Sequence, residues 1–293
     1  LRRELENYSK DQNLKKFIEQ NKFNLFLIDA AGVLYTDAGA IPGAPEAVDF
    51  LKSKGPVYIV TNNSYQTPSA IAKRFSESKF NIDAKQILTP GLGIQYDESI
   101  KSMISNKNVY VYGREFSLPY FDNSNCAKIV PTLDDADVIA MMSTYKPDNI
   151  NPFNDLKNHI LKNPSKQIFC CNPDIHVVTH ENVKKPVIGY YAKKLQNETH
   201  TPVLFFGKPF ENFSKMVKQI IEKEGPRLSL KTCFFDDNLE NVTDMSQHIG
   251  ISGACITDTG LSQHISKSLN SKNPAATDTQ PNSQIYFVSK LSI

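Results

Sequence analysis

Short apolar runs alternate with segments of helical periodicity along most of the chain. The runs are almost continuous, as in strands that a parallel sheet buries on both faces. They cover residues 25–28, 57–60, 108–113, 136–142, 167–171, 203–206, 232–235 and 254–257. Between them, segments such as 44–53 and 68–79 carry apolar residues at the spacing of one helix face, and residues 186–195 are also expected to be helical. This order predicts an α/β fold, a Rossmann-like parallel sheet with helices on its faces.

The pattern also predicts a division into domains. Residues 1–20 are expected to form an amphipathic helix, with Leu14, Phe17 and Ile18 on its apolar face. Residues 21–85 and 200–293 are expected to form one α/β core domain, and residues 86–199 a second α/β domain inserted into it. Residues 268–283 are polar and predict a loop, and residues 284–289 a terminal strand.

Polar residues suited to a phosphate or a metal follow four of the apolar runs. Because ligands bind at the carboxyl ends of the strands in such sheets, these positions are candidates for chemistry. They are Asp29, the stretch Thr61-Asn62-Asn63, Lys208 after Gly207, and the pair Asp236-Asp237 with Asn241 shortly after. Each one alone also fits a turn, a helix cap or a solvated lysine. The ordered set favours a functional site.

The chemistry of these side chains indicates phosphate and Mg²⁺. Carboxylates and amide oxygens are hard ligands, which Mg²⁺ prefers together with water and phosphate oxygens. Thr61, Asn62 and Asn63 precede a helix start, where backbone N–H groups favour an anion. A carboxylate such as Asp29 can also act as a nucleophile.

Composition excludes several other classes of protein. The formal charge of +2 gives no field that would attract nucleic acid or a membrane surface, and no apolar run approaches 18 residues. The five cysteines are odd in number and form no C-x-x-C pair, which argues against a disulfide framework or a thiolate zinc site. With a polar N-terminus unlike a signal peptide, these features predict a cytoplasmic protein.

At this point the sequence resembles the haloacid dehalogenase superfamily. The four motifs occur in order: D-A-A-G-V-L at 29–34, T-N-N-S at 61–64, G-K-P at 207–209 and F-F-D-D-N-L-E-N at 234–241. The insertion is similar to the large α/β cap of the branch with nucleotide-, sugar-phosphate and p-nitrophenyl phosphatases. The resemblance implies a phosphohydrolase of small phosphorylated metabolites with a cap that sets specificity. Because large caps often pair, it also suggests a homodimer through the cap.

The resemblance further implies a role for each matched residue. Asp29 would be the nucleophile and a Mg²⁺ ligand, with the Ala31 carbonyl and Asp237 as further ligands. Asp236 and Asn241 would support the metal site. Thr61 and Lys208 would hold the phosphoryl group, and the remaining expected phosphate-binding positions are Ala31, Gly32, Asn62 and Asn63.

One position departs from the family pattern. Family phosphatases usually read D-x-D-G, and the second Asp is the general acid and base, whereas this chain has Ala31. Loss of that group could cost about 10²–10⁴-fold in rate. Three hypotheses therefore stay open: an impaired or specialised phosphohydrolase, a non-catalytic protein that binds a phosphorylated ligand, and a hydrolase of C–P or C–halogen bonds. Asp236-Asp237 and the large cap argue against the third.

Overall fold

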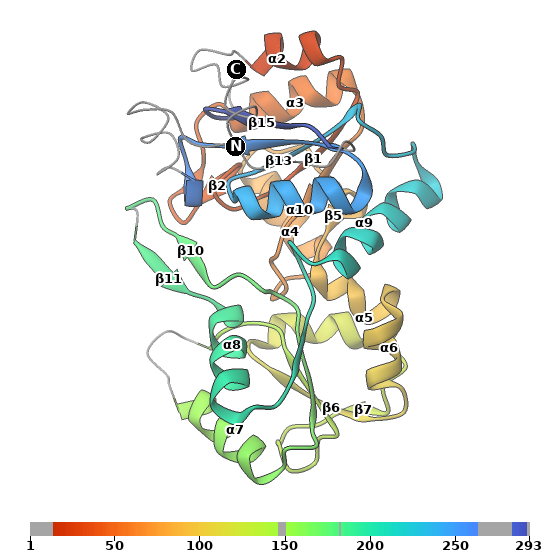
Figure 1. Ribbon diagram of the computed structural model, residues 1–293, viewed down its shortest axis with the longest axis vertical. Helices are drawn as coiled ribbons and strands as arrows, with labels where there is room; N and C mark the ends of the chain where they lie inside the picture. The colour runs from red at the N-terminus through yellow and green to blue at the C-terminus, as the bar shows by residue number, and fades with distance from the viewer. Residues whose placement is uncertain (1–13, 146–150, 182, 263–282, 292–293) are drawn as a thin grey trace.

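Two parallel sheets organise the protein, one in each of two lobes (Figure 1). The computed structural model describes residues 14–145, 151–181, 183–262 and 283–291. The upper lobe in Figure 1 contains both ends of the described chain and is called the core; the lower lobe is called the cap. The α/β fold expected from the sequence is therefore confirmed.

The core sheet has six strands in the order β15-β14-β13-β1-β4-β5, and every neighbouring pair is parallel. The strands are β1 (Leu25–Ile28), β4 (Val57–Val60), β5 (Ile87–Leu88), β13 (Thr232–Asp236), β14 (Ser252–Ile256) and β15 (Ile285–Val288). Helices α2 (Leu14–Asn21), α3 (Ala44–Lys54) and α4 (Pro68–Glu77) bury one face of the sheet. Helices α9 (Glu211–Glu224) and α10 (Leu239–Ile249) cover the other face.

The cap sheet has five parallel strands in the order β12-β9-β8-β6-β7. They are β6 (Asn108–Tyr112), β7 (Lys128–Ile129), β8 (Val138–Met141), β9 (Gln167–Cys170) and β12 (Val203–Phe205). Helices α7 (Asn151–Lys162) and α8 (Ile188–Thr199) pack on one face. The short helices α5 (Gly93–Tyr96) and α6 (Glu98–Ile104) lie on the other.

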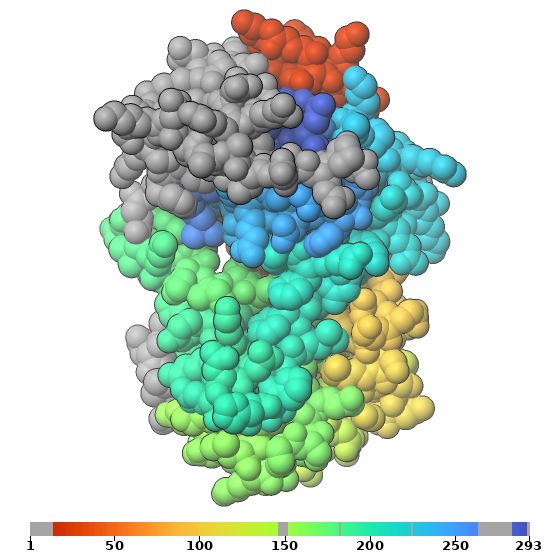
Figure 2. Space-filling model, in the orientation of Figure 1, coloured from red at the N-terminus to blue at the C-terminus, as the bar shows by residue number. Residues whose placement is uncertain are grey.

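The two lobes share one hydrophobic cluster. It runs from Leu27 in the core sheet to Phe169 in the cap sheet, and Phe206 lies within it, against the ring of Phe213 at 5.7 Å. Figure 2 shows the segment that leads from β12 into α9, in teal to cyan, passing from one lobe to the other. Close packing extends to the backbone, because a Cβ on Gly93 would lie 2.4 Å from the Phe206 ring. The cap therefore packs firmly against the core on this side.

Two small hairpins lie on the opposite side of the contact between the lobes. In the core, β2 (Tyr35–Thr36) pairs with β3 (Gly39–Ala40) directly after the Asp29 turn. In the cap, β10 (His176–Val178) pairs with β11 (Lys184–Pro186) and reaches toward β2 (Figure 1). The two hairpins bring exposed loops of both lobes together beside the core sheet.

Most predicted strands and helices are confirmed, with three corrections. The run at 203–206 was assigned to the core, but β12 pairs with β9 and belongs to the cap sheet. Residues 87–88 were assigned to the inserted domain, but they form core strand β5. The helix expected from residue 186 begins at Ile188, because 184–186 form β11, a strand too short and exposed to show periodicity.

Two of the expected segments lie wholly or partly outside the described residues. Of the predicted N-terminal helix, residues 14–20 lie in α2, whereas residues 1–13 lie outside the described residues, as does most of the polar stretch 268–283. None of the described helices has the length and apolarity needed to cross a bilayer.

Candidate active site

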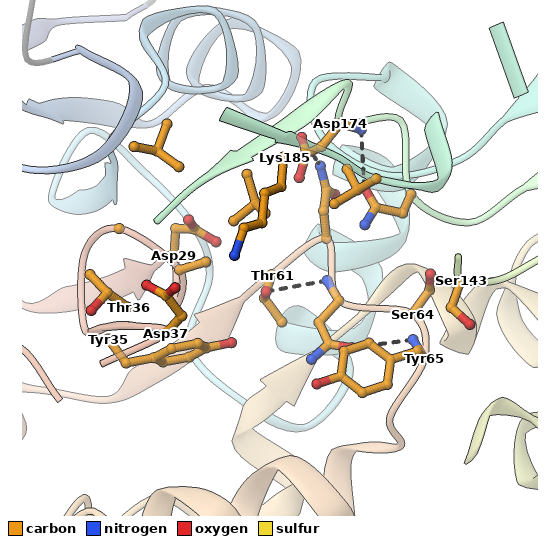
Figure 3. Close-up of a pocket in the computed structure, with 18 of the residues that line it drawn as sticks. Asp29, Tyr35, Thr36, Asp37, Thr61, Ser64, Tyr65, Ser143, Asp174 and Lys185 are labelled. Atoms are coloured by element: carbon orange, nitrogen blue, oxygen red, sulfur yellow. Dashed lines mark hydrogen bonds between the residues drawn. The ribbon is translucent and has the colours of Figure 1, made fainter. Parts of the chain in front are cut away.

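The predicted site residues converge at the carboxyl ends of three adjacent strands. Asp29 follows β1, Thr61 follows β4 and Asp236 ends β13, and β1 lies between the other two in the sheet. Lys208 enters from the loop before α9. All four side chains are buried, and Figure 3 shows Asp29 and Thr61 side by side in the wall of a cavity.

Lys208 lies between two of the carboxylates. Its Nζ is 2.6 Å from Asp29 Oδ1 and 2.7 Å from Asp236 Oδ2, and the residue is 1% exposed. Burial alone would lower the pKa of Lys208, but the negative charges of Asp236 and Asp29 raise it above its ordinary value. The ammonium therefore stays charged and fixes the orientation of Asp29.

Asp236 and Asp237 have different environments although they are adjacent. Asp236 accepts hydrogen bonds from Lys208 Nζ, from the Asn238 N–H (2.8 Å) and from Asn241 Nδ2 (3.2 and 3.3 Å). Asp237 Oδ2 accepts one from the Leu261 N–H at 2.6 Å. Burial, followed by the charge of Asp236, raises the pKa of Asp237 well above its usual range. The negative charge of Asp237 is thus stabilised by fewer hydrogen-bond donors than that of Asp236.

The geometry fits a divalent cation. Oxygen atoms of Asp29, Asp236 and Asp237 all lie within 4.8 Å of one another, and within this cluster the only compensating cation is Lys208. Burial raises the pKa of Asp29 to about 7, although Lys208 opposes the shift. Among the described residues, the buried Asn241 Oδ1 has no hydrogen-bond partner. Oxygen ligands with excess negative charge suit a hard divalent cation, such as the Mg²⁺ expected from the sequence.

The stretch Thr61-Asn62-Asn63 forms the neighbouring wall. Thr61 Oγ1 accepts a hydrogen bond from the Asn63 N–H at 3.3 Å. Asn62 uses its side chain within the protein: its Oδ1 accepts from the Lys208 N–H (2.8 Å), and its Nδ2 donates to the Lys208 carbonyl (3.0 Å). Asn62 can therefore offer a phosphate its backbone N–H, while its side chain positions the lysine loop.

The cap contributes Asp174 to the same network. Asn62 Nδ2 also donates to Asp174 Oδ1 at 2.9 Å, and Asn172 Oδ1 accepts from the Asp174 N–H at 3.0 Å. Burial raises the pKa of Asp174 to about 6, against the opposing charge of Lys208. One buried amide thus joins the lysine loop and the cap.

A cavity of about 740 Å³ opens above these groups, between the core and the cap. Ala31, Gly32 and Tyr35 line its core side, and the Arg74 guanidinium lies 4.4 Å over the Tyr35 ring. The β10–β11 hairpin and Asp174 line its cap side. This volume accommodates a small metabolite above Asp29.

Several residues of the site could not be found from the sequence. Lys185 lines the cavity from β11, and His180 at the hairpin tip contacts Asp37: Oδ1 of Asp37 accepts from the His180 N–H at 2.7 Å and lies 3.0 Å from its Nδ1. These residues lie in two- or three-residue strands and turns, which carry no periodicity signal. Leu261 contributes only a backbone N–H, for which no side-chain pattern exists.

The chain is similar to known hydrolases and phosphatases. A family model described as haloacid dehalogenase-like hydrolase matches residues 26–126. The 4-nitrophenylphosphatase of Schizosaccharomyces pombe is 21% identical over 285 residues, which cover 87% of this chain and 89% of that protein.

Solved structures share the fold. A possible sugar phosphatase from Cytophaga hutchinsonii superposes with a TM-score of 0.75 at 17% identity, over 98% of this chain and 99% of that one. A glycerol phosphate phosphatase from Mycobacterium tuberculosis, solved in complex with magnesium, has a TM-score of 0.66 at 15% identity, over 82% and 69% of the two chains. Four motifs meet at one sheet edge, a haloacid dehalogenase-like family model matches residues 26–126, and the capped fold is shared, so the chain is similar to members of the haloacid dehalogenase superfamily that carry a large α/β cap.

Proposed function

We propose that this protein is a Mg²⁺-dependent phosphohydrolase that acts on a small phosphorylated metabolite through an aspartyl phosphate on Asp29. The observation that carries the proposal is the setting of Asp29. One of its oxygens is fixed by Lys208 at 2.6 Å, and the side chain lines the cavity next to Thr61. A carboxylate held in this way can attack phosphorus and split hydrolysis into two steps.

Each neighbouring group has a role in this proposal. The Thr61 hydroxyl, Lys208 and the backbone N–H of Asn62 would hold the phosphoryl oxygens. The N–H groups of Gly32 and Asn63, also predicted for this role, already donate to the Tyr35 carbonyl (2.8 Å) and to Thr61 Oγ1 (3.3 Å). Asp29, Asp237 and the Ala31 carbonyl would hold Mg²⁺, which would offset negative charge on the phosphoryl group. Asp236 and Asn241 would orient Lys208 and the metal ligands. The cap would exclude water and select the substrate.

Ala31 favours a second candidate function. Its methyl group can neither protonate a leaving oxygen nor activate water, and it lines the cavity at the position of the family's second Asp. The same site could then bind a phosphorylated ligand without turning it over. The 4-nitrophenylphosphatase of Schizosaccharomyces pombe, similar over most of this chain, supports the catalytic alternative.

Hydrolysis of 4-nitrophenyl phosphate with and without Mg²⁺ tests the proposal. We expect Mg²⁺-dependent turnover that Asp29→Asn lowers by at least about 10³-fold, because the amide cannot act as the nucleophile. Asp122→Asn, an exposed carboxylate of the cap, is the matched control and should leave the rate unchanged. Unmodified protein that is quenched during turnover should gain the mass of one phosphoryl group, and Asp29→Asn treated in the same way should not.

The outcomes separate the two candidates. Turnover that survives Asp29→Asn would disprove the proposed nucleophile. An inactive protein that gains turnover only as Ala31→Asp would show an intact scaffold and favour the binding function. If neither the unmodified protein nor Ala31→Asp hydrolysed the substrate, the phosphohydrolase proposal would lose its support.

A further inference from the structure

The absence of a carboxylate at position 31 raises the question of which group protonates the leaving oxygen. The following inference rests on the proposed phosphohydrolase function. Among the described residues that line the cavity, the cations are Lys208, Arg74, Arg114 and Lys185, with His176 as a further titratable group. These side chains differ in their contacts with the rest of the protein, and this difference identifies a candidate for the proton donor.

Three of the cations are already engaged. Lys208 is held between Asp29 and Asp236. Arg74 lies over the Tyr35 ring and donates from Nη1 to the Tyr65 hydroxyl at 3.4 Å, and the Arg114 guanidinium lies 5.8 Å from the Tyr65 ring centroid. Lys185 has no carboxylate within 4 Å in the described part of the chain, and no hydrogen bond of its Nζ is found there. Its ammonium is therefore available to a ligand.

The backbone directs Lys185 into the cavity. In β11, Lys185 pairs with Val177 of β10, and both residues line the cavity. Successive side chains of a strand point to opposite sides, so Lys184 points away and does not line the cavity. Figure 3 shows the Lys185 side chain extending from the hairpin toward Asp29.

The hairpin that carries Lys185 is attached to the core. The Asp37 carboxylate accepts a hydrogen bond from the His180 N–H at the hairpin tip. Within the cap, the Thr179 N–H donates to the Val183 carbonyl at 3.0 Å, and the Val187 N–H donates to the Ile175 carbonyl at 3.2 Å. These bonds hold the backbone on both sides of Lys185, so its ammonium is presented above the nucleophile from a fixed position.

We propose that Lys185 is a catalytic residue that replaces the missing carboxylic acid as proton donor to the leaving group. As Asp29 bonds to phosphorus, the ester P–O bond breaks and its electron pair stays on the leaving oxygen. That oxygen takes a proton from the Lys185 ammonium and departs as an alcohol, which leaves a neutral amine. An alkylammonium is a far stronger acid than an alcohol, so the transfer is favourable.

The second step restores both residues. The Lys185 amine takes a proton from water as the water oxygen bonds to phosphorus. The bond between phosphorus and Asp29 breaks, its electron pair returns to the carboxylate, and inorganic phosphate leaves. Lys185 regains its ammonium and Asp29 its charge.

Leaving groups of different basicity test the proposal. The substrates are glycerol phosphate, whose alkoxide needs a proton, and 4-nitrophenyl phosphate, whose phenolate does not. We expect Lys185→Met to lower kcat by about 10²-fold for glycerol phosphate and by less than about 3-fold for 4-nitrophenyl phosphate. Lys184→Met is the matched control and should equal the unmodified protein on both. Ala31→Asp should restore glycerol phosphate turnover to Lys185→Met.

Other results would overturn the proposal. Equal losses on both substrates would show a role in binding or folding. Two results would show that Lys185 donates no proton: glycerol phosphate turnover that survives Lys185→Met, and turnover that is retained in Lys185→Arg. In each of these cases, 4-nitrophenyl phosphate turnover that still depends on Asp29 would leave the phosphohydrolase function intact. Turnover that survives Asp29→Asn would instead refute that function.

Discussion

Asn62 shows how a residue of the phosphate motif can act within the protein. Its amide pairs with both the N–H and the carbonyl of Lys208 and also donates to Asp174 of the cap. Asn62 is 3% exposed and Lys208 1% exposed, so water cannot replace these hydrogen bonds easily. The position of Lys208, and through it that of Asp29, depends on one side chain from the neighbouring strand.

Asn62→Ala should therefore destabilise the protein strongly. Each buried polar group left without a partner costs about 1–3 kcal/mol, so we expect the free energy of unfolding to fall by roughly 2–4 kcal/mol. Urea unfolding followed by circular dichroism measures this change. Asn81→Ala, at an exposed position, is the control and should be neutral. A loss below about 0.5 kcal/mol for Asn62→Ala would show that the network contributes little.

At the residue scale, the sequence predicts the groups that follow apolar strands but not which distant residues they contact. Asp29, Thr61 and Asp236 can be inferred because strand ends meet at one sheet edge. The contact of Asn62 with Asp174 joins residues 112 positions apart, and it exists only because the cap folds over the core. No local sequence pattern indicates a contact between residues so far apart in the chain.

The β10–β11 hairpin is the element that closes the cavity over the core. Asp37 in the β2–β3 turn accepts from the His180 N–H at 2.7 Å and lies 3.0 Å from the His180 ring. The hairpin itself has two strands of three residues, of which β11 is exposed and β10 mostly half-buried, and such a hairpin is barely stable alone. Its position therefore depends on this contact with the core.

Asp37→Ala should loosen the hairpin without unfolding the protein. We expect hydrogen exchange of the amides in 176–178 and 184–185 to accelerate by about 10-fold, because the opening free energy of a locally held segment is small. The melting temperature should not change, since the contact is exposed. Asp134→Ala removes a comparable carboxylate–histidine contact, with His159 elsewhere in the cap, and should leave this exchange unchanged. Unaltered exchange in Asp37→Ala would show that other contacts hold the hairpin.

At the element scale, periodicity succeeds where a strand or helix is long and buried. Strands β1 and β4 are found with their observed bounds, because each is a run of four apolar residues, all of them buried in β1 and three of them in β4. Strand β12 is found but assigned to the wrong sheet, because an apolar run does not encode its partner. The hairpins are missed, since strands of two or three residues are too short to show a periodic pattern.

For the whole molecule, the acidic site links folding to pH and metal. Burial raises the pKa of Asp29 to about 7 and that of Asp174 to about 6, whereas an unfolded chain has ordinary carboxyl values. Between pH 4 and 7 the folded protein therefore binds more protons than the unfolded chain. Its stability is greatest at the acidic end of this range and is lost as pH rises. A divalent cation should reverse the trend, because it binds the ionised carboxylates.

Unfolding experiments across pH test this linkage. In metal-free protein, we expect the stability difference between the unmodified chain and Asp29→Asn to fall as pH rises from 4.5 to 7.5, with a slope approaching 1.4 kcal/mol per pH unit, about one proton. Mg²⁺ should raise the melting temperature more at pH 8 than at pH 5 in the unmodified protein, and little in Asp29→Asn. A difference that stays constant or increases with pH would mean that Asp29 is ionised throughout, with Lys208 alone compensating its burial. Mg²⁺ would then meet the same charge on Asp29 at both pH values, and its stabilising effect should be similar at pH 5 and pH 8.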